Sequence, residues 1–96
     1  MKTTKRISRK QLQKHIDGLI ALAKTVTPDV TSEILIPGYD GQHAWLSLYV
    51  PDEFDDQIDE LVSERVYDIF VNSDYDIGAL VYDKSQLRNT VISTND

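Results

Sequence analysis

Two segments of alternating apolar residues, separated by a short turn, constrain the fold of this chain more than any other feature. Residues 30–36 and 43–50 both alternate, and the sequence Tyr39-Asp40-Gly41 lies between them. Alternation on both sides of a glycine-containing turn predicts a β-hairpin, because successive side chains of a strand point to opposite faces.

The length of the turn decides which side chains share a face. A two-residue loop at Asp40 and Gly41 would place Ile36 opposite Trp45 and mix both faces of the hairpin. A three-residue loop with Gly41 in the left-handed conformation instead gives one consistently apolar face, since a slip of one residue moves every side chain to the other face. This register, which we predict, pairs Ile36 with Ala44, Ile34 with Leu46 and Val30 with Val50.

A helix is predicted before the hairpin. Ser8 and Gln11 have the spacing of a capping box, in which the serine accepts from the third amide and the glutamine reaches back. Apolar residues then recur at helical spacing until Pro28: Leu12, Ile16, Leu19, Ile20 and Ala23. Arg9 and Lys10 lie at the positive end of the helix dipole, so we expect an acidic neighbour to compensate them.

A second helix is predicted after the hairpin. It begins at Pro51-Asp52 with Asp52 as its N-cap and ends at residues 72–74. Its predicted buried stripe consists of Phe54, Ile58, Leu61, Val62, Ile69 and Phe70. The apolar run 77–82 predicts a buried strand that follows this crossover helix, and residues 90–93 are a candidate fourth strand.

Together these elements predict an α+β domain in the order αββαβ, with a possible further β. We expect two helices packed on one face of a three- or four-stranded, mainly antiparallel sheet. The domain spans residues 8–93, between a basic flexible lead-in at 1–7 and a loose tail at 94–96. A chain of 96 residues suits one such domain.

Composition excludes several classes of protein. The chain has no cysteine, which excludes disulfides, thiolate zinc sites, iron–sulfur clusters and cysteine nucleophiles. Its apolar stretches fall far short of the ~20 residues that cross a membrane. We therefore expect a soluble, cytoplasmic protein that uses no cofactor and no metal.

The sheet face turned away from the helices is the first candidate site. Leu35, Trp45 and Tyr49 point to this face, and Tyr82 or Leu80 of the third strand extends it. Large rings with a hydrogen-bonding end suit interface cores, so we predict a non-catalytic interaction module that self-associates or binds another protein. Alternatively, the aromatic pairs only stiffen the sheet, or residues 84–96 fold over them.

The charge distribution offers a second function, related to nucleic acid. Residues 1–24 hold seven lysines and arginines against one aspartate, a formal charge of +6, whereas the rest holds three against fifteen carboxylates, −12. Lys5, Arg6, Arg9 and Lys10 are candidate phosphate contacts, although the acidic body repels phosphates. Conversely, a mimic of nucleic acid would present its acidic helix, through Asp55, Asp56, Asp59, Glu60 and Glu64.

The third function is enzymatic. Ser63 followed by Ser73-Asp74-Tyr75-Asp76-Ile77 resembles a fragment of the nucleotidyltransferase signature, Gly-Ser and then Asp-x-Asp. The resemblance implies that Asp74 and Asp76 share one face of a strand and hold Mg²⁺. The chain departs from that signature at Val62, which stands in place of the glycine, and in the helical pattern of the preceding segment.

Overall fold

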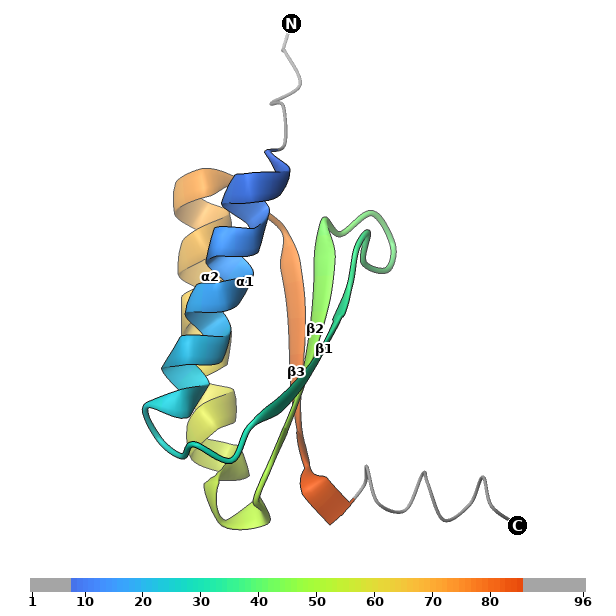
Figure 1. The fold of residues 1–96 in the computed structure, drawn as a ribbon. Coiled ribbons are helices and arrows are strands. Elements are labelled where there is room, and N and C mark those ends of the chain that lie inside the picture. Colours follow the sequence, from blue (N-terminus) through green and yellow to red (C-terminus); the bar gives the residue numbers. More distant parts are fainter. Residues whose placement is uncertain (1–7, 86–96) are drawn as a thin grey trace, which may run out of the picture.

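The protein consists of a layer of two helices on one side of a three-stranded sheet (Figure 1). The computed structural model describes residues 8–85; the segments 1–7 and 86–96, and with them the predicted strand at 90–93, lie outside the described residues. The elements are α1 (Arg9–Lys24), β1 (Thr31–Leu35), β2 (Ala44–Val50), the 3₁₀ turn η1 (Asp52–Phe54), α2 (Asp55–Ser73) and β3 (Ile77–Asp83). Neither helix of the described chain has the length and hydropathy that would let it cross a membrane.

The sheet has the strand order β1-β2-β3 and is mixed. β1 and β2 pair antiparallel as a hairpin, whereas β2 and β3 pair parallel. The α+β class and the two-helix layer are confirmed, but the expectation of a mainly antiparallel sheet is not. The reason is that α2 carries the chain back to the end of the sheet where β2 began, which makes the next strand parallel.

The hairpin has the predicted register, with Ile34 opposite Leu46. The amide of Gly38 donates to the carbonyl of Gln42 over 3.0 Å, which closes a loop of three residues. Gly41 has a φ of 85°, as predicted, and Asp40 also has a positive φ, 51°, which was not predicted. A side chain at position 38 would meet the backbone carbonyl of Ala44 at 2.8 Å, so glycine is required there as well.

The core lies between β2 and the two helices. On the sheet side, Ile77 of β3 and every second residue of β2 are buried: Ala44, Leu46, Leu48 and Val50. The two helices supply the other side: Leu12, Ile16, Leu19, Ala23, Ile58, Val62 and Ile69. Burial of one Leu or Ile side chain contributes roughly 1.5–3 kcal/mol. This contact therefore holds the two layers together.

The start of α1 differs from a capping box in one hydrogen bond, the one that the Ser8 amide donates. The Ser8 hydroxyl accepts from the amide of Gln11 over 3.2 Å, as predicted. The Ser8 amide, however, donates to the Tyr75 hydroxyl over 3.2 Å instead of to the Gln11 side chain. Within residues 8–85, no carboxylate pairs with Arg9 or Lys10, and the first turn contains no acidic residue, so the predicted compensation is absent from this part of the chain.

Two predictions for α2 are wrong. Asp52 does not cap the helix, because the 3₁₀ turn η1 comes first and Phe54 occupies the N-cap position. Phe70 does not belong to the buried stripe: it is 50% exposed, since each residue rotates about 100° around the helix and Ile69 takes the core-facing position. Tyr75, beyond the end of the helix, is buried instead, with 5% of its surface exposed.

Two glycines give opposite predictions for stability. In α1, a methyl group at Gly18 would meet no atom within 4 Å, so Gly18→Ala is expected to raise the free energy of unfolding by about 1 kcal/mol through helix propensity. Gly38→Ala is expected to lower it by roughly 1–3 kcal/mol, because the methyl group collides with backbone that cannot move away. Urea denaturation of both variants checks this; a stable Gly38→Ala protein would contradict the loop geometry.

Candidate functional site

The sheet face opposite the helices carries nine side-chain positions in register. The strand pairings arrange them in three rows across β1, β2 and β3: Leu35, Trp45 and Gly78; Glu33, Ser47 and Leu80; Thr31, Tyr49 and Tyr82. We call this set the open face, because both described helices pack on the other side of the sheet (Figure 1). The four residues predicted for an interface, Leu35, Trp45, Tyr49 and Tyr82, all lie on it.

Trp45 is held on the open face by three neighbours. Its indole ring lies over Gly78 of the parallel strand, where an added Cβ would come within 2.4 Å of the ring carbon Cε3. The indole nitrogen Nε1 donates to the Ser47 hydroxyl over 3.1 Å. The Tyr39 ring packs edge-on against the indole, with ring centroids 5.3 Å apart and an interplanar angle of 72°. These contacts keep the ring in one position, half-buried.

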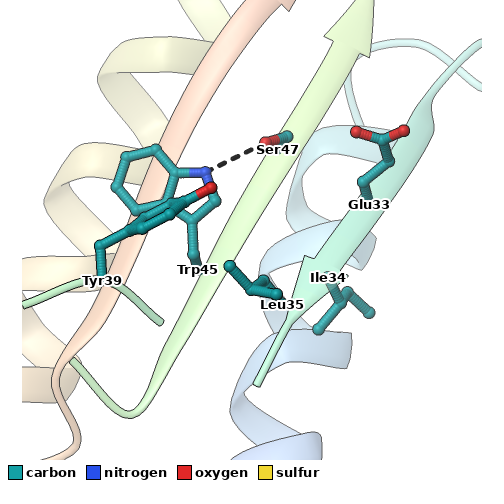
Figure 2. A pocket seen from close by; sticks show the side chains of 6 residues that line it. All are labelled: Glu33, Ile34, Leu35, Tyr39, Trp45 and Ser47. Atoms are coloured by element: carbon teal, nitrogen blue, oxygen red, sulfur yellow. Dashed lines mark hydrogen bonds between the residues drawn. The ribbon is translucent and has the colours of Figure 1, made fainter. Parts of the chain in front are cut away.

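Beside the indole, the open face forms a hollow of about 480 Å³ (Figure 2). Trp45 and Tyr39 stand on one side of it, and Glu33 and Leu35 of β1 stand on the other, with Ser47 between them. Ile34 completes the lining. From the sequence, Tyr39 was predicted only as a turn residue. Its role was missed because no local pattern indicates that the hairpin loop folds its ring onto the second strand.

The other end of the open face carries a tyrosine pair. Tyr49 and Tyr82 stack with centroids 5.3 Å apart and an interplanar angle of 22°. The Tyr49 hydroxyl donates to Oε1 of Glu33 over 3.2 Å. Burial raises the pKa of Tyr49, and the negative charge and the hydrogen bond of Glu33 raise it further. The bond therefore links the tyrosine pair to the edge of the hollow.

Glu33 is the only ionisable carboxylate on the open face, and within residues 8–85 it forms no ion pair. A cation does lie beside the neighbouring row, which contains Thr31: the Lys84 ammonium donates to the Thr31 hydroxyl over 3.2 Å. That ammonium group, however, is paired with Asp29 at 2.6 Å. The negative charge of Glu33 is thus left without a compensating cation in the described chain.

The candidate phosphate contacts lie on a different surface. Arg9 and Lys10 are exposed at the start of α1 and, with Lys14 and Asp17, border a second hollow in the helix layer. Lys5 and Arg6 lie outside the described residues. The basic group and the open face are therefore separate sites, and the phosphate-contact role stays a prediction.

The carboxylates of the enzymatic alternative do not share a strand. Asp74 is the left-handed C-cap of α2, with φ 65°, and Asp76 precedes β3. The amide of Asp76 donates to Nδ1 of His43 over 2.9 Å, and its carbonyl accepts from the His43 amide over 2.8 Å. In the described part of the chain, no three histidine or acidic side chains are grouped to hold a metal ion. The arrangement that the nucleotidyltransferase resemblance implies is thus not formed.

The acidic residues of α2 are spread along its outer side. Asp56, Asp59, Glu60 and Glu64 are exposed, whereas Asp55 is half-buried. Further along the same helix, Tyr67, Phe70 and Val71 form a second exposed apolar group, which we call the α2 patch. The α2 patch was not predicted, because Phe70 was expected to lie in the core.

The residue types of the open face are those found on binding surfaces. It combines rings, leucines, hydroxyls and one carboxylate, which are groups that contact another surface through apolar burial and hydrogen bonds. Comparisons of the chain with protein-family models, with curated proteins and with solved structures gave no match.

The contact between Glu33 and Tyr49 predicts a pH effect. Glu33→Gln removes the negative charge and is expected to lower the pKa of Tyr49 toward its ordinary value of 10.0, with burial keeping part of the shift. Because the folded-state pKa is raised, the stability linked to this group is complete below the unfolded pKa and is lost as pH rises through the folded one. NMR titration of the tyrosine rings measures the change, and an unaltered Tyr49 curve would show that the carboxylate is not its partner.

The packing of the Trp45 ring over Gly78 gives another prediction. Gly78→Ala is expected to push the indole off the sheet and move its fluorescence emission to longer wavelength, because the new methyl group occupies the position of the ring. Trp45 is the chain's only tryptophan, so the emission reports on this ring alone. Leu80→Ala, on the same strand and face, is the control and leaves the emission in place. Unchanged emission in Gly78→Ala would contradict the described contact.

Proposed function

We propose that this protein is a non-catalytic interaction module whose open face binds another protein chain, either a second copy or a different protein. The observation that carries the proposal is that Trp45, Tyr49, Tyr82 and two leucines lie together on a sheet face that no described element covers. We also place the module in the cytoplasm, because a chain without cysteine suits a reducing compartment.

The residue types of the open face support this function. Tryptophan and tyrosine dominate the energetics of many interfaces, since they bury a large area and lose little conformational freedom. Here the indole and the tyrosine pair are already held by their neighbours, which lowers the entropy lost on binding. Leu35 and Leu80 are both more than two-fifths exposed and add apolar area beside the rings.

The net charge of −6 affects the choice of partner. Two copies repel each other at long range, although salt screens this repulsion beyond roughly 8 Å. Self-association through the open face therefore depends on the apolar and aromatic contacts, whereas a partner with positive charge gains from both kinds of interaction.

A charge placed on the open face is expected to abolish binding. Leu80→Asp introduces a carboxylate at a position that is 44% exposed, so folding is retained while apolar contact is lost. Val71→Asp makes the same change in the α2 patch, at a position that is 55% exposed, and is the matched control. If the partner is a second copy, sedimentation velocity at low and high protein concentration is expected to show association of the native protein and of Val71→Asp, and a monomer for Leu80→Asp.

The opposite pattern would contradict the proposal. Association that is lost in Val71→Asp and kept in Leu80→Asp would assign the interface to the α2 patch. A native protein that stays monomeric at every concentration would exclude a second copy as partner. Selection of displayed peptides on the native protein, with Leu80→Asp as the counter-selection, then decides whether the open face binds other chains.

A further inference from the structure

We infer that the hollow on the open face receives an arginine side chain from a different protein. This inference rests on the proposed function and specifies the chemistry of the partner. The hollow has an aromatic side, formed by Trp45 and Tyr39, and a side that carries the Glu33 carboxylate and Leu35 (Figure 2). Such a combination of rings and a carboxylate attracts an organic cation.

The register sets the spacing of the two sides. Glu33 lies opposite Ser47, so Trp45, two residues away on β2, is its diagonal neighbour. Diagonal neighbours on a sheet are about 7–8 Å apart at the backbone, and the indole leans over Gly78 of β3, so the ring and the carboxylate border the hollow from opposite sides with space between them for a flat group. A guanidinium group is flat, and the hollow of about 480 Å³ also has space for the stem of the side chain.

The Glu33 carboxylate is already oriented by a neighbouring side chain. The Tyr49 hydroxyl holds Oε1 of Glu33, which fixes the orientation of the group. Within the described residues, Oε2 forms no bond, and no cation pairs with either oxygen. Glu33 is an exposed carboxylate without a compensating cation among residues 8–85, at the edge of a hollow lined by rings and polar groups, so it favours a positively charged side chain and disfavours a phosphate or a carboxylate of the partner.

Arginine fits this site better than lysine does. Its guanidinium is weakly hydrated, stacks on rings and donates through a planar fork to a carboxylate, whereas the lysine ammonium is compact and strongly hydrated. The protein's net charge of −6 further favours a basic partner over a second copy of the same acidic chain. The partner segment we infer is therefore apolar, to cover Leu35 and Leu80, and carries an arginine for the hollow.

A peptide selection followed by a double-mutant cycle tests the inference. Random peptides displayed on phage are selected on the native protein and counter-selected on Leu80→Asp. A selected peptide is then synthesised with its arginine or with neutral citrulline, and both are titrated onto the native protein, Glu33→Gln and the control Val71→Asp. Glu33→Gln and citrulline are each expected to weaken binding about tenfold, the effect expected for the loss of one charged contact beside a ring.

The two losses are expected not to add, because both remove the same contact. Peptides that need the open face but contain no arginine, or an arginine peptide that binds Glu33→Gln as tightly as the native protein, would overturn the arginine site and leave the module intact. If no selected peptide distinguishes the native protein from Leu80→Asp and the native protein does not self-associate, the proposed function fails as well. Self-association that Glu33→Gln abolishes would overturn the assignment to a different protein.

Discussion

The alternation of β2 is the constraint on which the rest of the structure depends. Ala44, Leu46, Leu48 and Val50 have no exposed surface, and they are the part of the sheet that the helices cover. Since the residues between them must point the opposite way, burial of this set places Trp45 and Tyr49 on the open face. A slip of one residue in the hairpin would exchange the two sets, and the three-residue loop between Gly38 and Gln42 prevents it.

The parallel strand β3 completes both faces at once. Its residues alternate in step with those of β2, so Ile77 faces the helices beside Ala44 while Gly78 lies beside Trp45 on the open face. The crossover through α2 brings β3 to this position and also supplies the helix that covers the core (Figure 1). The open face is therefore a product of segments far apart in the sequence, and it exists only in the folded chain.

Much of the fold and part of the candidate site could be predicted from the sequence. The hairpin register, the positive φ of Gly41 and the Ser8 cap follow from local patterns of apolar residues and turn chemistry, and the structure has all three. The sharing of one face by Leu35, Trp45 and Tyr49 follows from the same register, whereas the place of Tyr82 depends on the pairing of β3 with β2.

The features that were not predicted depend on contacts between distant segments. The Tyr75 hydroxyl accepts a hydrogen bond from the Ser8 amide, 67 positions away. No local rule for helix capping includes a partner so distant in the sequence. Tyr39 completes the hollow only because the hairpin loop bends over the second strand. Ile69 and Phe70 were both placed in the core, but hydrophobicity alone does not show that only residue 69 meets it.

The contact between Trp45 and Gly78 has a consequence for evolution of this chain. The ring needs a position without Cβ on the adjacent strand, so the two sites are coupled although 33 positions separate them. In homologous sequences, a large ring at the first site is compatible with glycine at the second, and a smaller residue at the first releases the second to accept a side chain. The pair would then appear as a correlated substitution, which identifies the parallel neighbour of β2 without any coordinates.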